Sequence, residues 1–259
     1  MRIKNIESLA VECDIPQKIH MTWKNNNVDE LLQSQNPMIQ NGLRNIVEMN
    51  PDWDFEMSDD DQMQQYLKDG LESSDYKMLE STDIVARSDV WRLLKIYKEG
   101  GLYMDIDRFY NIPLHKIINP KTKMLLPIHM EIFFSQDVMC SYKGNQVYEK
   151  VINRMFEKRR DGMNDILHLG PHVYSQVMVK ELLDVEINTP FGDAYKQIYN
   201  VLSDCDYIET YLEGHMTQPT MFFSMDASTW RPGNGRTKAN WYGEQQTQHW
   251  KKRYRKNGK

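Results

Sequence analysis

Apolar positions along the first half of the chain follow two periods. Between residues 15 and 23 they recur at every second position, which predicts an early strand. From residue 82 to residue 99 they recur at i, i+3, i+4 and i+7, which predicts an amphipathic helix with one buried stripe. Asp83 lies in the first turn of this helix and Gly100 follows its end, as helix termini favour.

The remaining pattern predicts alternating strands and helices. Further helices are expected at 37–50, 59–68, 146–159 and 172–183, and strands at 54–57, 100–110, 123–127 and 131–138. Beyond residue 188 prolines and glycines indicate a loop-rich segment. Strands that alternate with helices predict an α/β fold, in which ligands bind beyond the carboxyl ends of the strands.

Two aspartates lie at the end of the strand expected at 100–110. Asp105 and Asp107 are two positions apart, so in a continuous strand their carboxylates point the same way, about 6.5 Å apart. Two like charges on one face are unfavourable without a cation between them. The pair therefore indicates a Mg²⁺ or Mn²⁺ site. An exposed acidic turn or a structural Ca²⁺ site is the alternative.

Composition and charge exclude some classes of function. The chain has 259 residues and a net charge of -5, which argues against a nucleic-acid binder. The basic run 251–256 is the exception: it is either a solvated tail or a contact for phosphates or an anionic membrane. Three isolated cysteines, Cys13, Cys140 and Cys205, predict free thiols. With no long apolar run and no signal-peptide pattern, we expect a soluble cytoplasmic protein.

Several segments together resemble a known family. The sequences ARSDVWR at 86–92 and YKEGGLYMDID at 97–107 are similar to the DXD sugar-binding glycosyltransferases of family 32, and more distantly to the catalytic domains of the clostridial glucosylating toxins. The segment IPQKIHMTW at 15–23 resembles the opening strand of the family. Residues 50–60 and the Gly170-Pro171 turn agree in order and spacing.

The resemblance implies a fold and a reaction. It implies the GT-A fold, one Rossmann-like α/β domain over residues 1–259 with a mixed central sheet flanked by helices. Residues 15–110 would form the nucleotide-sugar and metal half, and residues 111–250 the acceptor half with a closing C-terminal segment. The implied activity is retaining transfer of a hexose from a nucleotide-diphosphate sugar to a glycan or other hydroxyl acceptor. A UDP-sugar is the expected donor, although relatives use GDP-mannose, and Mn²⁺ or Mg²⁺ is the expected metal.

The resemblance also assigns roles to acidic and basic residues. Asp107 would bind the metal directly, and Asp105 would contact the ribose or sugar and also the metal. Asp89 and Arg92 would hold hydroxyls of the donor sugar, and Arg92 would also approach the phosphates. Without the resemblance, Asp89 and Arg92 read as a local ion pair at the surface of a helix.

Aromatic and histidine residues complete the expected site. Trp23 would stack on the base, with His20 and Thr22 beside it in the nucleotide pocket; a core position is the alternative for Trp23. Tyr103 would lie near the nucleotide or pack in the core. His249 would be a third metal ligand or a phosphate contact, in competition with the segment 228–230.

Three residues are candidates for the acceptor side, and two other functions are alternatives. Asp137 would face the anomeric carbon or be a solvated acid, and His168 and His172 would touch the acceptor or serve structural roles. A sugar-nucleotide-binding module without transfer activity is the non-enzyme alternative. A dehalogenase-type phosphatase would need its DxD in the first strand, followed by Thr or Val, whereas Arg108 and Phe109 follow here.

Overall fold

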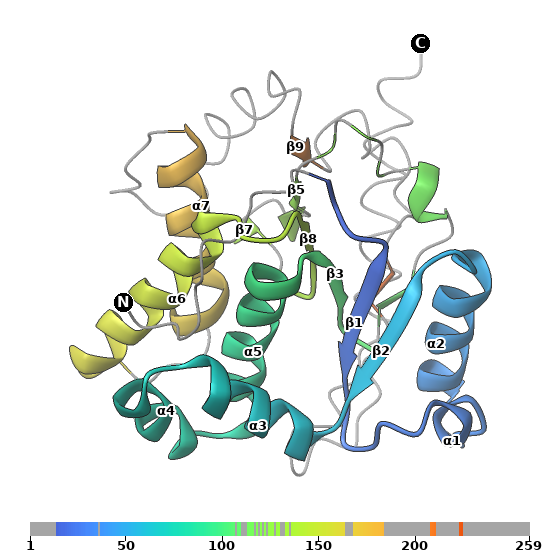
Figure 1. Ribbon diagram of the computed structural model, residues 1–259, viewed down its shortest axis with the longest axis horizontal. Coiled ribbons are helices and arrows are strands. Elements are labelled where there is room, and N and C mark those ends of the chain that lie inside the picture. Colours follow the sequence, from blue (N-terminus) through green and yellow to red (C-terminus); the bar gives the residue numbers. More distant parts are fainter. Residues whose placement is uncertain are drawn as a thin grey trace, which may run out of the picture.

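The structure is a computed structural model of the chain. It describes residues 14–35, 37–106, 108–109, 113–116, 118, 120, 122, 124–126, 128–129, 133–134, 136–163, 168–183, 208–210 and 223–224. Figure 1 shows these residues as coloured ribbon. Among them, no helix has both the length and the apolar character needed to cross a membrane.

A mixed β-sheet forms the centre of the molecule. Its strands lie in the order β2-β1-β3-β8-β5-β9. The bounds are Lys18–Thr22 for β1, Asp54–Ser58 for β2, Gly101–Met104 for β3, Met124–Leu126 for β5, Val138–Ser141 for β8 and Ile208–Thr210 for β9. Strands β1, β2 and β3 are parallel to one another, whereas β8 runs antiparallel to both β3 and β5. The carboxyl ends of β1, β2 and β3 therefore share one edge of the sheet.

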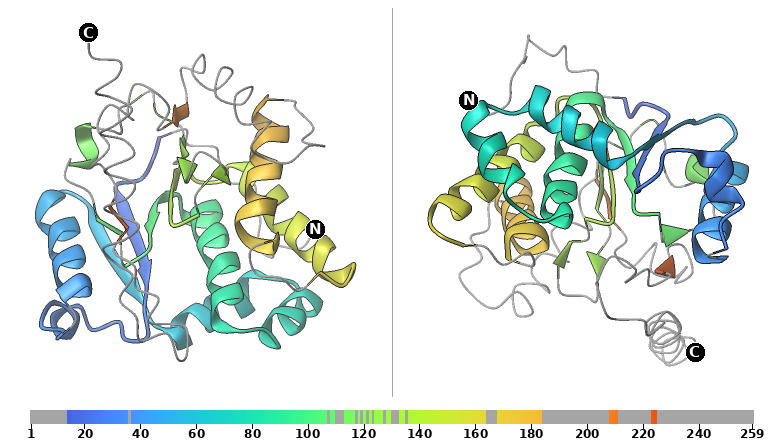
Figure 2. Two further views of the ribbon diagram at one scale, coloured as in Figure 1. Left: turned by 180° about the vertical axis from the view of Figure 1, so that it is seen from behind. Right: turned by 90° about the horizontal axis from the view of Figure 1, so that it is seen from below.

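Helices cover both faces of this sheet (Figures 1 and 2). Their bounds are Val28–Leu32 for α1, Pro37–Met49 for α2, Asp60–Gly70 for α3, Ser73–Glu80 for α4, Ile84–Glu99 for α5, Gln146–Arg160 for α6 and Val173–Leu183 for α7. Helix α2 lies on one face, and α5 with α3, α6 and α7 lies on the other. The α/β fold with a mixed central sheet flanked by helices is thus confirmed.

Short elements complete the described chain. Two further strand pairs join β4 to β10 and β6 to β7, with bounds Arg108–Phe109, Phe223–Ser224, Ile128–His129 and Phe133–Phe134. A 3₁₀ turn, η1, spans Leu114–Lys116, and a π-helical turn, η2, spans His168–His172 just before α7.

Two apolar clusters, one on each face, hold the sheet between the helices. Because strand side chains alternate between faces, Ile19 and Met21 of β1 join the cluster under α1 and α2. On the opposite face Tyr103 of β3 packs with Trp91 of α5. The predicted apolar stripe of α5 is buried in this second cluster, with exposures of 0–2% for Val90, Leu93, Leu94 and Tyr97.

The connection from α5 to β3 depends on local backbone chemistry. The Asp83 side chain accepts a hydrogen bond from the Ala86 N–H and caps α5. Gly100 and Gly101 have φ values of 72° and 89°, in the left-handed region that glycine tolerates. A Cβ on Gly101 would lie 2.4 Å from the Lys18 carbonyl oxygen. The Gly-Gly pair therefore lets β3 pack directly against β1 after a sharp turn.

The predicted elements differ from the structure in several places. Strands β9 and β10 lie in the segment expected to be loop-rich, and β9 belongs to the central sheet. The strand expected at 100–110 is not continuous: β3 ends at Met104, Asp105 is outside it, and Ile106 lies in a turn. Helices α1 and α4 were not predicted, because neither spans enough residues to show a clear helical period. The strand expected at 131–138 is replaced by β7 and β8, with a bend at Gln136 and Asp137 between them.

Candidate functional site

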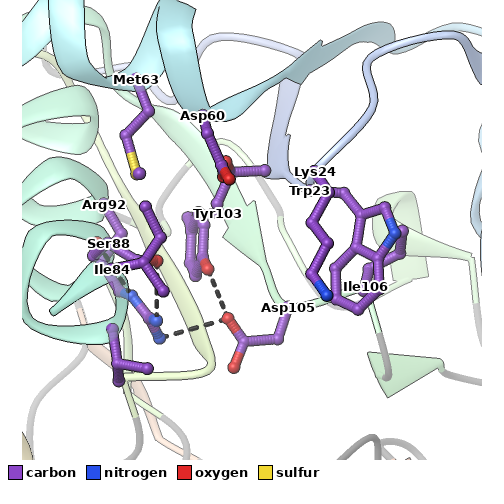
Figure 3. A pocket seen from close by; sticks show the side chains of 12 residues that line it. Trp23, Lys24, Asp60, Met63, Ile84, Ser88, Arg92, Tyr103, Asp105 and Ile106 are labelled. Carbon is purple, nitrogen blue, oxygen red and sulfur yellow. Dashed lines mark hydrogen bonds and ion pairs between the residues drawn. The ribbon is translucent and has the colours of Figure 1, made fainter. Parts of the chain in front are cut away.

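A pocket lies where the three parallel strands end. It has a volume of about 170 Å³ (Figure 3). Its walls come from the segments that follow β1, β2 and β3, and from the first turns of α5. The lining residues are Thr22, Trp23, Lys24, Asp60, Met63, Ile84, Val85, Ser88, Arg92, Tyr103, Asp105 and Ile106. The pocket thus occupies the edge at which open α/β sheets bind their ligands.

Arg92 of α5 connects most of the polar groups at this site. Its Nη1 lies 3.2 Å from Asp105 Oδ1 and donates to the Gln136 carbonyl oxygen at 2.9 Å. Its Nη2 lies 3.2 Å from Asp89 Oδ1 and donates to Ser88 Oγ at 3.2 Å, while Nε donates to the Ser88 carbonyl oxygen at 3.4 Å. Three of these contacts are hydrogen bonds and two are ion pairs. The charge of Arg92 is therefore already shared between two carboxylates of the protein.

Asp105 is held at the end of β3 by three neighbours. The Tyr103 hydroxyl donates to Asp105 Oδ1, on the same oxygen that faces Arg92 (Figure 3). The Asp105 backbone N–H donates to the Asp137 carbonyl oxygen at 2.8 Å. The Arg92 guanidinium lies 4.8 Å from the centre of the Tyr103 ring, in a cation–π arrangement. These contacts fix the direction of a carboxylate that is still 29% exposed.

Asp89 and Arg92 form a buried pair. Their side chains are 10% and 9% exposed, so the alternative of an ion pair at the surface of a helix does not hold. Burial raises the pKa of Asp89 to about 6, Arg92 opposes the shift, and the nearby Asp105 charge adds to it. One guanidinium is thus shared between two carboxylates.

The residues expected to bind the nucleotide separate into two groups. Thr22, Trp23 and Tyr103 line the pocket. Trp23 is half-buried and also packs against the core, so its two proposed roles are compatible. Tyr103 is 1% exposed and meets Trp91 edge-on, with ring centres 6.0 Å apart. Tyr103 is therefore a core residue whose hydroxyl reaches the site.

His20 does not line the pocket. It lies two positions before Thr22 on β1, about 6.5 Å deeper in the sheet, and it is fully buried. Its Nε2 donates to the Gly100 carbonyl oxygen at 2.9 Å. The expectation that His20 contacts the nucleotide therefore does not match its position. Alternation along β1 places His20 on the same face of the sheet as Thr22, but two residues further from the end of the strand where the pocket lies.

His20 belongs instead to a network of charges below the pocket. It lies with Glu56 and Glu99 in a group whose potential metal-ligand atoms are all within 4.8 Å of one another. Lys95 contacts Glu56 at 2.7 Å and Glu99 at 2.5 Å, and Lys18 contacts them at 2.6 Å and 3.0 Å. Two ammonium groups already balance the two carboxylates. The network is therefore a structural link between β1, β2 and α5 rather than a metal centre.

Several expected site residues lie outside the described chain. These are Asp107, His249, the segment 228–230 and the basic run 251–256, together with Cys13 and Cys205. Cys140 is a buried free thiol in β8, as expected for an isolated cysteine. Asp137 meets the site through its carbonyl oxygen. His168 and His172 begin and end η2.

Some pocket residues had not been singled out from the sequence. Lys24 and Asp60 follow the ends of β1 and β2, and Ser88 is one turn before Arg92. Gln136 is not a lining residue, but it contributes its carbonyl oxygen to Arg92; its buried side-chain amide has no hydrogen-bond partner among the residues that the structure describes. A signal for Lys24 and Asp60 was available, since Lys24 directly follows the strand predicted at 15–23 and Asp60 lies in the first turn of the helix predicted at 59–68, after the next strand. Gln136 becomes visible only when β8 is placed beside β3.

Comparison with known proteins finds a family match and a curated relative. Residues 4–124 match the family described as "glycosyltransferase sugar-binding region containing DXD motif". A curated relative, the inositol phosphoceramide mannosyltransferase 3 of Schizosaccharomyces pombe, is 27% identical over 110 residues, which are 40% of this chain and 28% of that protein. The chain thus matches less than a third of the length of this relative.

A solved structure is also similar in shape. The PaToxG glycosyltransferase aligns with a TM-score of 0.49 at 19% sequence identity, over 73% of this chain and 74% of that chain. The family match is the informative result, because it includes β1, β2, α5 and β3, the elements that form the pocket. The similarity of this chain to the DXD-containing glycosyltransferases, expected from its sequence, is thereby confirmed over residues 4–124.

Proposed function

We propose that the protein is a glycosyltransferase that moves a hexose from a nucleoside-diphosphate sugar to a hydroxyl acceptor. The observation that carries this proposal is the position of Asp105. It lies at the end of a parallel strand, its direction is fixed by Tyr103 and Arg92, and it faces a pocket that also contains Trp23. Such a pocket offers an aromatic surface for a base and a fixed carboxylate for the sugar, ribose or metal.

Each part of the pocket has a role in this proposal. Trp23 stacks on the base, and Thr22 and Tyr103 lie beside the nucleotide. Arg92 and Asp105 act at the sugar end, where hydroxyls of the sugar bind Asp105. Asp89 does not line the pocket, so its proposed part in holding the sugar is indirect, through its ion pair with Arg92. Because Arg92 already pairs with Asp89 and Asp105, a direct contact between Arg92 and the phosphates would compete with these two ion pairs.

A divalent cation, Mn²⁺ or Mg²⁺, fits the chemistry of this edge. Carboxylate oxygens are its preferred ligands, and Asp105 presents a partly exposed carboxylate there. We propose Asp105 and Asp107 as protein ligands, with His249 as a third. When bound, such an ion neutralises charge that develops on the departing diphosphate.

The proposed reaction replaces one bond at the anomeric carbon. The bond from that carbon to the diphosphate oxygen breaks, a bond to the acceptor oxygen forms, and the acceptor hydroxyl gives up its proton. The diphosphate leaves with the electron pair of the broken bond. We propose that the configuration at the anomeric carbon is retained and that the donor is a UDP-sugar, with GDP-mannose as the second donor to test.

A binding module without transfer activity is the competing function. Release of labelled sugar from UDP-glucose, UDP-galactose or GDP-mannose in the presence of Mn²⁺ distinguishes the two. The enzyme releases sugar to water or to an added acceptor. A nucleotide sugar that binds without any release would support the module instead.

A further inference from the structure

Lys24 is a cation on the pocket wall to which no role has been assigned. It follows Trp23, two positions beyond the end of β1, and lines the pocket on the side that faces Asp105 and Ile106. Figure 3 shows its side chain running alongside the indole of Trp23. Its Nζ lies 5.9 Å from the centre of that ring, so the ammonium stays beside the pocket.

The charged residues that line the pocket differ in how many contacts they make with the protein. Four charged residues line it: Asp60, Asp105, Arg92 and Lys24. Arg92 makes ion pairs with Asp89 and Asp105 and donates three hydrogen bonds within the protein, as described above. Within the described part of the chain, the Lys24 ammonium has its ring contact with Trp23 and an electrostatic interaction with Asp60, but no hydrogen bond or ion pair. Lys24 is therefore the pocket cation whose donors remain available to a ligand.

A nucleoside diphosphate brings at least two negative charges into this pocket. Asp60 and Asp105 carry the same sign, so the ligand needs positive charge that the protein has not already neutralised. An ammonium is a compact cation with three donors, and lysine is a common phosphate ligand. The stem of Lys24 lies along Trp23, the residue proposed to hold the base. A phosphate attached to a stacked nucleoside would thus lie within reach of Lys24.

We propose that Lys24 binds the diphosphate of the donor nucleotide. This inference rests on the proposed function, because it assumes that a nucleotide occupies the pocket. It assigns the base to Trp23, the diphosphate to Lys24 and the sugar to the end of the pocket that Arg92 and Asp105 line. Lys24 accordingly contributes to binding of the nucleoside diphosphate and of the intact donor, but not to binding of the nucleoside.

The test compares the affinities of nucleosides and nucleoside diphosphates by calorimetry in the presence of Mn²⁺. The ligand pairs are uridine with UDP and guanosine with GDP. In wild type, the diphosphate should bind more tightly than its nucleoside. In Lys24→Gln this advantage should fall by about tenfold, the factor expected for one charge-assisted hydrogen bond, while nucleoside affinity is unchanged.

Two further variants sharpen the test. Lys24→Arg keeps the charge and should retain most of the diphosphate advantage. Lys68→Gln removes one positive charge from the exposed surface of α3, outside the pocket, and should behave as wild type. The diphosphate affinity of wild type should also fall more steeply with added salt than that of Lys24→Gln.

The outcomes separate the two proposals. If Lys24→Gln keeps the full advantage of the diphosphate over the nucleoside, the role of Lys24 is wrong and the proposed function stands. If Lys68→Gln loses the same advantage, the effect is one of net charge and the role of Lys24 is again wrong. If neither nucleosides nor diphosphates bind wild type, both proposals fail.

Discussion

Arg92 lies between two carboxylates, and this arrangement sets the electrostatics of the site. Asp89 and Asp105 each have an oxygen 3.2 Å from a different guanidinium nitrogen. One positive charge cannot fully balance both, and Asp89 is the more deeply buried of the two. Asp89 is therefore the carboxylate whose ionisation costs more, which is why its pKa rises to about 6.

The raised pKa of Asp89 predicts a specific dependence of stability on pH. In the unfolded chain this carboxyl has its ordinary pKa of 3.8, so between about pH 4 and pH 6 the unfolded state loses a proton that the folded state keeps. The free energy of unfolding of wild type therefore decreases as the pH rises through this range, because ionisation of Asp89 costs more in the folded state. In Asp89→Asn the side chain stays neutral, so this decrease is absent.

The measurement is urea unfolding of wild type and Asp89→Asn at several pH values. The free energy of unfolding of the variant minus that of wild type should increase by about 2 kcal/mol from pH 4 to pH 6, because the two pKa values lie close to the ends of this range. Groups that titrate identically in the two proteins cancel in this difference. A difference that stays flat or decreases over that range would show that the folded-state pKa of Asp89 is not raised.

Gln136 presents a buried amide, and within the described part of the chain neither of its polar atoms is hydrogen-bonded. An unsatisfied buried amide costs free energy, and methionine has a similar length without that cost. Gln136→Met should therefore increase the free energy of unfolding by about 1 kcal/mol. Gln176→Met, on the exposed side of α7, is the matched control and should have little effect. A loss of stability specific to Gln136→Met would mean that the amide has a partner, such as a bound water.

Residue-level prediction from sequence succeeded where chemistry is local. The spacing of Asp89 and Arg92 places them on one flank of a helix, and the structure confirms that they pair. It failed for His20, because alternation gives the face of a strand but not the depth within the sheet. Sequence-based prediction also missed Lys24, since an exposed lysine becomes a candidate ligand contact only when the structure places it beside the other charged residues of a pocket.

Among the elements, β3 has the largest effect on the site. It is short, it ends one residue before Asp105, and it begins at a glycine that touches β1. The turn at Ile106 means that Asp105 leaves the sheet instead of continuing along it. The geometry of the site therefore depends on how β3 packs against β1 and β8.

Gly101 allows the close contact between β3 and β1. Gly101→Ala places a Cβ 2.4 Å from the Lys18 carbonyl oxygen and also strains a φ of 89°. Gly162→Ala is the matched control, because its φ is 86° but a Cβ there meets nothing within 4 Å. Both variants carry the strain of a positive φ, about 1–2 kcal/mol, and only Gly101→Ala adds the clash.

Denaturant unfolding of the two glycine variants provides the comparison. Gly101→Ala should lose at least about 2 kcal/mol more stability than Gly162→Ala, the scale of overpacking costs. Equal losses in the two variants would show that β1 and β3 are not in close contact at this position.

Helices with a long apolar period were predicted well, whereas short elements were not. Helix α5 has a capping aspartate, a buried apolar stripe and a terminal glycine, and all three features indicate a helix over the same residues. Helices α1 and α4, of 5 and 8 residues, are too short for periodicity to identify. The bend between β7 and β8 depends on contacts with β3 and α5, which no local pattern contains.

At the scale of the whole molecule, the site is a product of topology. Three parallel strands end at one edge, and each contributes side chains to the same pocket: Lys24 after β1, Asp60 after β2 and Asp105 after β3. Alternation of strands and helices predicted the α/β class and this edge as the ligand site. Which residues meet there depends on strand order and on the antiparallel β8, and these come only from the structure.

The central claim is that the protein transfers sugar at the pocket where β1, β2 and β3 end. Loss of activity in Asp105→Asn tests this claim most directly. The measurement is release of labelled sugar from UDP-glucose, UDP-galactose and GDP-mannose with Mn²⁺, for wild type, Asp105→Asn and Asp61→Asn. Asp61 is an exposed residue of α3 outside the pocket, so its variant makes the same chemical change away from the site. We expect release by wild type and Asp61→Asn, and a reduction of at least about a hundredfold in Asp105→Asn, because the substitution removes a charge aligned with the reacting diphosphate. Equal release by Asp105→Asn and wild type, or no release from any of these donors by wild type, would contradict the account.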